Sequence, residues 1–429
     1  MRFLSSDKNA RKRKKHKKEK KIRHTPALDH RSRAGFPLLW GMENFDEKAC
    51  LCALNRIFGF RPKIALALIE HIGNATDIFK LREKELEELI GPYSTHKGKI
   101  STSAAEDAAH ELLELEKQGI RFCGITEDTY PSLLKECPDP PIGIYIRSCS
   151  PLEELWNNNN PIGIIGTRDI TPYGKEWCTR IVQALSNTSN KPLIISGLAL
   201  GTDIEAHRAS MDFGLPTVGV MATGPDSIYP IRNRSTAEAM ASTPGCALIT
   251  DYPPGTAPLA IHFLRRNRII AGLSKAVILI ESKVKGGGLN TCRLAFSYNR
   301  DVYALPGRID DLRSQGCNMI IREKIAEPIT STTALLESLG IGFSANSTKL
   351  TEPEKMQLLL EGKYSQHEIH TMAKLMQLIK AQRGITVEEI SYKSGMDYRR
   401  TAEMTALMEI EGLISIDILQ RCSINYKNV

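Results

Sequence analysis

Five short segments of the chain are rich in the residue types that bind phosphate groups. Glycine lets a backbone approach an anion closely, serine and threonine donate a hydroxyl hydrogen, and arginine donates two parallel hydrogen bonds. Phe263 adds an aromatic surface on which a base can stack, although it can equally be interpreted as a core residue. The residues that we predict to bind phosphate groups, or a base beside them, are Gly166, Thr167, Arg168, Ser196, Gly197, Phe263, Arg266, Asn267, Arg268, Gly287, Gly288, Asn290 and Thr291.

Nearly every one of these segments follows a short apolar run that reads as a buried strand. The runs lack polar alternation, which is typical of strands covered on both faces, and they alternate with helical stretches. This pattern predicts an α/β fold with a Rossmann-like parallel sheet and helices on both faces. The carboxyl ends of parallel strands meet at one edge, so we expect the five segments to converge there. The runs are Ile162–Ile165, Leu193–Ile195, Thr217–Val220, Ala247–Ile249, Ala276–Ile280 and Val302–Leu305.

The basic cluster Arg265–Arg268 is expected to begin a helix that continues through Ile269–Leu273. Cations are unfavourable at a helix N-terminus unless an anion is bound there, and a bound phosphate would supply that anion. We therefore expect Arg266 and Arg268 to face the same groove as Arg168. The alternative is that these arginines form ion pairs with acidic residues near the sheet edge.

No combination of side chains in the sequence matches a known catalytic or metal-binding pattern. A Walker loop and an HExxH motif are absent, and we find no paired carboxylates at a recognisable spacing. Asp203 is interpreted as a helix cap, and His207 as a residue with a local structural hydrogen bond. We predict that the chain is not an enzyme and needs no metal or cofactor.

The segments on either side of the sheet are predicted to form two smaller domains. Residues 42–119 read as helical, and Leu66–Phe79 resembles a helix-hairpin-helix whose turn amides could hold a phosphate. A plain helical hairpin is the interpretation that we favour. After the Rossmann-like domain of residues 120–340 and a linker of residues 341–365, residues 366–429 have the pattern of a winged helix. Its helix from Tyr398 carries acidic residues beside Arg399 and Arg400, so a protein contact or a structural cap is as good an interpretation as DNA binding.

The charge of the chain is concentrated at its beginning. Of 429 residues with a net charge of +8, residues 1–33 carry fourteen Lys or Arg and three Asp or Glu, which leaves a mildly acidic remainder. We expect residues 1–41 to be a disordered basic tail, either a nucleic-acid-binding arm or a non-native extension with Met42 as the true start. The ten cysteines form no CxxC pair, which favours reduced thiols, and no apolar run is long enough to span a membrane.

Taken in chain order, the motifs resemble the DprA/Smf family of bacterial DNA-processing proteins over about residues 120–330. That family has a Rossmann-like domain with flanking helical and winged-helix parts. The resemblance rests on Gly166–Arg168 with Tyr173-Gly174, Ser196-Gly197, Gly201–Asp203, Ala206-His207, Tyr229-Pro230, Asn233, Tyr252–Gly255, His262-Phe263, Arg266–Ser274, Pro306-Gly307 and Gly316–Asn318.

The resemblance implies a cytoplasmic protein of natural transformation. Such a protein would bind and protect incoming single-stranded DNA, load the RecA recombinase onto it, and form a homodimer through the Rossmann-like domain. Two departures from the family pattern concern a glycine loop and the wing. Gly287-Gly288-Leu289 stands where the family often has Gly-Ser-Leu, and Leu419–Cys422 replaces a Gly-Gly hairpin.

Two other functions use the same kind of sheet. Nucleotide hydrolases of the LOG type carry a glycine loop followed by a catalytic glutamate, but Leu294 occupies that position here and cannot transfer protons. A regulatory module that binds a free nucleotide is the second alternative. Displacement of DNA by micromolar mononucleotides would favour it.

Overall fold

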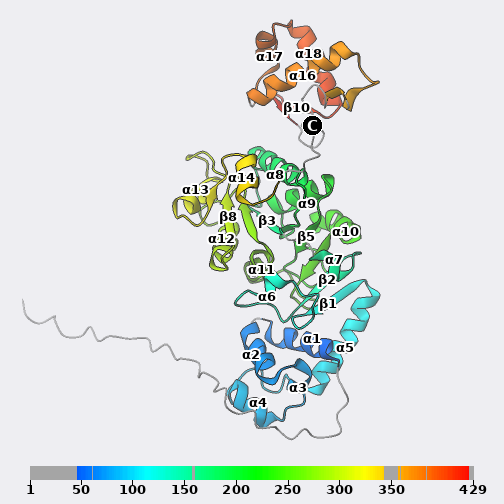
Figure 1. Cartoon of the computed structure of the whole chain (residues 1–429), viewed down its shortest axis with the longest axis vertical. Coiled ribbons are helices and arrows are strands. Elements are labelled where there is room, and N and C mark those ends of the chain that lie inside the picture. The colour runs from blue at the N-terminus through cyan, green and yellow to red at the C-terminus, as the bar shows by residue number, and fades with distance from the viewer. Residues whose placement is uncertain are drawn as a thin grey trace, which may run out of the picture. The chain divides into compact units, whose positions relative to one another are not determined.

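The structure is a computed structural model that describes residues 46–59, 61–156, 160–342, 356–357, 359–382 and 384–424. The predicted basic tail of residues 1–41 and most of the predicted linker lie outside these residues. Figure 1 shows the described elements in chain order.

Within the described residues, five helices precede the sheet: α1 (Glu47–Phe58), α2 (Pro62–Ile72), α3 (Ala75–Ile78), α4 (Glu83–Ile90) and α5 (Thr102–Lys117). The side chain of Asn74 caps α3, and α2 ends at Gly73 in the left-handed conformation. The carboxylate of Glu47 accepts hydrogen bonds from the amides of Ala75 and Thr76 at 2.8 and 2.9 Å. An acidic side chain of the chain therefore already occupies the turn amides, which favours the plain helical hairpin over a phosphate site.

A nine-stranded sheet has the order β1-β2-β6-β5-β4-β3-β7-β8-β9. Strands β3 to β9 run parallel, as the sequence predicts, while β2 pairs antiparallel with both β1 and β6. In register, Ile162 of β3 lies opposite Ile194 of β4 and Ala276 of β7. The strands are β1 (Ile120–Gly124), β2 (Gly143–Arg147), β3 (Ile162–Ile165), β4 (Ile194–Ser196), β5 (Thr217–Val220), β6 (Ala247–Thr250), β7 (Ala276–Leu279), β8 (Asp301–Ala304) and β9 (Glu327–Pro328).

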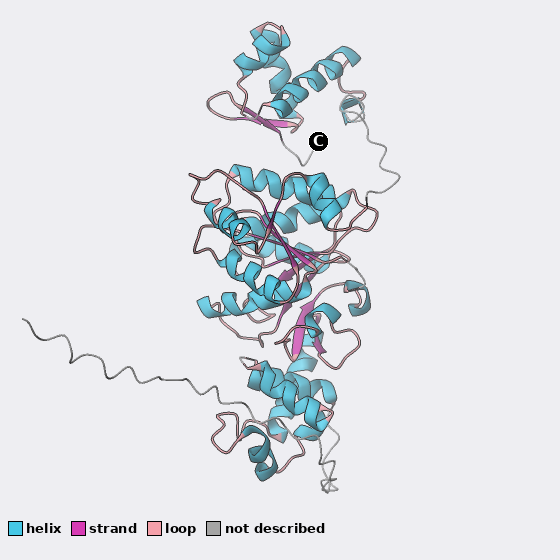
Figure 2. Cartoon of the chain, turned by 60° about the vertical axis from the view of Figure 1, so that its left-hand side comes forward, coloured by secondary structure: helices cyan, strands magenta, loops and turns pink. Residues whose placement is uncertain are grey.

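Helices cover both faces of this sheet (Figure 2). Successive residues of one strand point to opposite faces, so Ile164 and Ile165 of β3 belong to different apolar cores. One face packs against α8 (Pro172–Ser186), α9 (Thr202–Asp212) and α14 (Thr332–Ser338), with α10 (Arg234–Ser242) beside α9. The other packs against α6 (Ser132–Lys135), α11 (Ala260–Leu273), α12 (Gly287–Ser297) and α13 (Gln315–Arg322). Short elements α7 (Leu152–Leu155) and η1 (Ile231–Asn233) complete this part of the chain.

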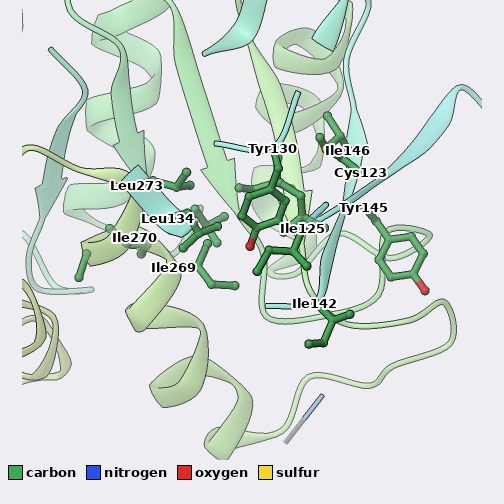
Figure 3. Close-up of a cluster of buried hydrophobic side chains, with 14 of the residues drawn as sticks. Cys123, Ile125, Tyr130, Leu134, Ile142, Tyr145, Ile146, Ile269, Ile270 and Leu273 are labelled. Carbon is green, nitrogen blue, oxygen red and sulfur yellow. The ribbon is translucent and has the colours of Figure 1, made fainter. Parts of the chain in front are cut away.

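The core on the α11 face continues into the helices before the sheet. Figure 3 shows Leu134 of α6 against Ile269 and Leu273 of α11, with Tyr130 beside them. On β2, the buried hydroxyl of Tyr145 donates to Glu111 of α5 at 3.1 Å. The antiparallel strands β1 and β2 thus connect the helical segment to the parallel sheet.

The last described residues form three helices and a two-stranded antiparallel hairpin, with an apolar core of their own. These are the elements that the sequence predicts for a winged helix, and that assignment stays a prediction. Capping boxes at Ser365 and Thr386 begin the first two helices. The elements are α16 (Gln366–Ala381), α17 (Val387–Ser394), α18 (Tyr398–Ile410), β10 (Ile414–Ile416) and β11 (Cys422–Ile424).

Candidate nucleic-acid interface

A cleft of about 750 Å³ lies where the order of the parallel strands reverses. From β3 the chain continues through β4, β5 and β6 on one side, whereas β7, β8 and β9 lie on the other. The loops after β3 and β7 therefore diverge, and ligands of open α/β sheets bind at such a point. Residues 166–169 form one wall of the cleft, residues 282–288 form the other, and α11 contributes a third side.

Helix α11 presents Phe263, Arg266, Asn267 and Ile270 to the cleft. Their spacing of three, four and seven residues places them on one helical face. Arg266 is only 3% exposed and donates from Nη1 to the carbonyl of Val220 at 2.9 Å. A Cβ atom on Gly197 would lie 1.6 Å from the same Nη1, so glycine is required beneath this guanidinium. Burial lowers the pKa of Arg266 to about 10, and the nearby Asp203 opposes that shift.

An aromatic pair and a cation lie side by side in the cleft. The guanidinium carbon of Arg168 is 5.0 Å from the centre of the Phe263 ring, and the Tyr229 ring centre is 5.6 Å from that of Phe263. Tyr229 is about half exposed and Phe263 partly so. This group therefore offers an apolar ring face and a positive charge at one place, which suits a nucleobase with its phosphate.

The cleft wall formed by the loop after β7 contains two cations that were not among the residues predicted from the sequence. Lys283 and Lys285 are exposed, line the cleft, and form no ion pair within the described residues. They directly precede α12, whose first residues Gly287 and Gly288 also line the cleft. The N-terminus of α12 carries a partial positive charge, which adds to that of the lysines. Their position between a buried strand and a glycine run was the signal that could have identified them.

Nine of the thirteen predicted residues line the cleft: Gly166, Thr167, Arg168, Phe263, Arg266, Asn267, Gly287, Gly288 and Thr291. Ser196 and Gly197 lie beneath it, because the Ser196 hydroxyl donates to the carbonyl of Ile164 and Gly197 supports Arg266. Asn290 donates to the carbonyl of Leu264 at 3.5 Å and lines no part of the cleft.

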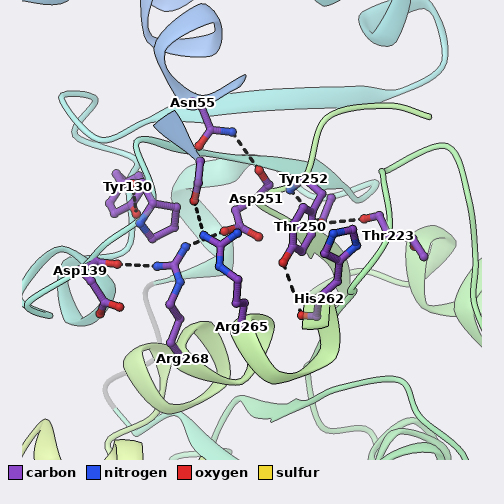
Figure 4. Close-up of polar contacts among 12 residues, drawn as sticks. Asn55, Tyr130, Asp139, Thr223, Thr250, Asp251, Tyr252, His262, Arg265 and Arg268 are labelled. Atoms are coloured by element: carbon purple, nitrogen blue, oxygen red, sulfur yellow. Dashed lines mark hydrogen bonds and ion pairs between the residues drawn. The ribbon is translucent and has the colours of Figure 1, made fainter. Parts of the chain in front are cut away.

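The expectation that Arg268 faces the cleft is wrong. Helix α11 begins at Ala260, so the basic cluster lies within the helix and the argument from its N-terminus does not apply. Arg268 points to the opposite face, where it pairs with Asp251 at 2.6 Å with both side chains buried (Figure 4). Arg265 lies on that side too and donates to the carbonyl of Gly59. The ion-pair alternative raised for these arginines therefore describes Arg268.

The buried acidic and imidazole groups near the cleft have structural partners. Glu281 accepts from the Thr171 amide at 2.9 Å and so holds the start of α8. Asp203 accepts from the Ala199 amide, and burial raises its pKa, which Arg266 partly offsets. His207 lies 2.7 Å from the Thr217 hydroxyl, and burial lowers its pKa to about 3. A neutral, fully buried imidazole supports the structural interpretation of His207.

The described residues contain neither a cluster of metal ligands nor a candidate membrane-spanning helix. They contain no group of three or more His, Cys, Asp or Glu side chains arranged to hold a metal ion. Among these residues, no helix combines the length and the apolar character that crossing a bilayer requires.

Comparison with known proteins assigns the family. The model of the family described as DNA recombination-mediator protein A matches residues 121–340, which include every residue of the cleft. The chain belongs to this family. It is 35% identical to Protein Smf of Synechocystis over 68% of this chain and 73% of that protein. It is 36% identical to the DNA processing protein DprA of Streptococcus pneumoniae over 51% of this chain and 73% of that protein.

A solved structure of a family member supports the fold. The X-ray structure of DprA from Streptococcus pneumoniae matches with a TM-score of 0.57 and 27% identity, over 71% of this chain and 99% of that one. The predicted resemblance to DprA and Smf proteins and the predicted Rossmann-like sheet are therefore confirmed. The cleft lies within residues 121–340, the part of the chain that matches the family model.

Proposed function

We propose that the cleft binds single-stranded DNA. Arg168, Lys283, Lys285 and the N-terminus of α12 would contact phosphates, while Phe263 and Tyr229 would stack with bases. The observation that carries the proposal is the juxtaposition of Arg168 over Phe263 with two unpaired lysines on the facing wall. In a duplex the base faces are already stacked, so an aromatic pair that receives a base favours an unpaired strand.

We further propose the finer role that the family resemblance implies. The protein would protect incoming single strands during transformation, load RecA onto them, and act as a homodimer through the Rossmann-like domain. It would have no catalytic activity, because the carboxylates near the cleft have structural partners and Leu294 replaces the acid of the LOG-type hydrolases. Hydrolysis of nucleoside monophosphates that disappears in an Asp203→Asn variant would contradict this last point.

A salt titration of oligo-dT binding tests the phosphate contacts. For single strands, log K falls with log salt by about 0.7 for each phosphate neutralised. The double variant Lys283→Ala/Lys285→Ala should therefore bind more weakly and flatten the slope by roughly 1.4. Lys135→Ala removes an exposed lysine from α6, outside the cleft, and serves as the matched control.

The same titration separates the proposal from a site for free nucleotides. If the slope of the double variant equals that of the control, the lysines do not meet phosphate and this assignment fails. If micromolar dTMP displaces the oligonucleotide, the cleft is better described as a mononucleotide site.

A further inference from the structure

One residue on the loop after β8 contacts both walls of the cleft. The carbonyl of Arg313 accepts from the amide of Ser282, in the loop after β7, at 2.7 Å. Its guanidinium donates to Asp169, in the loop after β3, with Nη2 and Nε at 2.5 and 3.2 Å from Oδ2. Nε also lies 3.1 Å from the Asp169 carbonyl oxygen. Arg313 therefore connects two loops that are separated by more than a hundred residues in the sequence.

Asp169 is an unusual residue for a cleft that binds phosphate. Its side chain is 66% exposed, lines the cleft, and directly follows Arg168. An isolated carboxylate there would repel a DNA phosphate, and two unit charges about 4 Å apart in water interact strongly enough to change affinity about fivefold. The pair with Arg313 cancels this negative charge and holds the backbone next to Arg168.

We propose that Arg313 is a positioning residue for DNA binding, which neutralises Asp169 and fixes the loop that carries Arg168. The inference rests on the proposed function of the cleft. In this role Arg313 contacts no phosphate. The pair is exposed to solvent, so it contributes little to folding stability, and its removal should leave the protein folded.

Oligo-dT binding by the full chain, with salt titration, tests the inference in three variants. Arg313→Gln should weaken binding about fivefold at low salt and flatten the salt slope, because Asp169 then opposes the phosphates. Asp169→Asn/Arg313→Gln restores the local net charge, so its slope should return to the wild-type value. Its affinity should recover only in part, because the loop stays untethered. Arg308→Gln is the control, since Arg308 forms a more exposed pair with Asp310 on the same loop, outside the cleft.

The possible results are distinguishable. A slope in the double variant that stays as flat as in Arg313→Gln would mean that Arg313 contacts phosphate directly, which overturns the inference. Unchanged binding in Arg313→Gln would mean that the Arg313–Asp169 pair does not affect DNA binding, which would also overturn the inference. If wild type and Arg308→Gln both fail to bind oligo-dT, the proposed function itself fails, and the inference with it.

Discussion

At the scale of single residues, the proposed DNA site would combine two kinds of contact that respond differently to salt. Arg168 and the two lysines offer charge, whereas Phe263 and Tyr229 offer ring faces. Counterion release follows charge alone, so stacking contributes to affinity without changing the salt slope.

Phe263→Ala should therefore weaken oligo-dT binding by about 1–3 kcal/mol and leave the salt slope unchanged. Tyr93→Ala, which removes a 97% exposed ring outside the cleft, is the control. Fluorescence anisotropy at several salt concentrations measures both quantities. A changed slope, or affinity equal to that of the control, would show that Phe263 does not stack with a base.

His207 should make folding stability depend on pH. Its pKa is lowered to about 3 by burial, from an ordinary value of 6.5. The unfolding free energy is therefore at its full value above pH 6.5 and decreases as the pH falls toward 3. Within this window the unfolded chain binds one more proton than the folded chain, which costs about 1.4 kcal/mol per pH unit.

Denaturant unfolding between pH 7 and 4 measures this effect. The difference in unfolding free energy between wild type and His207→Gln should shrink as the pH falls, whereas His110→Gln, at an exposed position, should leave the pH profile unchanged. A pH-independent difference would mean that His207 is not the group that titrates.

At the scale of elements, helix α11 presents polar side chains on two opposite faces. Phe263, Arg266 and Asn267 line the cleft, while Arg265 and Arg268 face the region around Asp251 and the end of α1 (Figure 4). A difference of two positions rotates a side chain by about 200° around a helix, so Arg266 and Arg268 cannot serve the same site.

Arg268→Ala should lower the unfolding free energy by about 3–5 kcal/mol, because it leaves the buried Asp251 without its cation. The salt slope of DNA binding should not change. Arg234→Ala, which breaks an exposed pair with Glu238, should cost at most about 1 kcal/mol. A variant that stays stable but binds DNA with a flatter slope would restore the phosphate role of Arg268.

The sequence could predict most of the sheet but only part of the cleft. The six apolar runs lie on β3 to β8 with boundary shifts of at most one residue, because strands buried on both faces are uniformly apolar. Strands β1 and β2 were missed, since each is only five residues long and has a glycine and an arginine among its apolar residues. Arg268 was misplaced because the helix was taken to begin at the basic cluster rather than at Ala260. Lys283 and Lys285 belong to no recognisable motif. They lie in the cleft because their loop follows strand β7.

At the scale of the whole molecule, the sign of the total charge does not locate the binding site. The net charge of +8 comes from the first 33 residues, and the rest of the chain is mildly acidic. Binding by the body must then depend on a local group of cations, and the cleft supplies one. The basic tail would add a non-specific attraction for any nucleic acid.

Oligo-dT binding by the protein without residues 1–41 tests whether the cleft is the DNA site. If the cleft is the site, this protein should bind with at most a few-fold loss at physiological salt, and Lys283→Ala/Lys285→Ala in the same background should weaken it further. The measurement is one salt-titrated anisotropy curve for each protein. Loss of binding on removal of the tail alone would place the DNA site outside the sheet and rule out the cleft as the site.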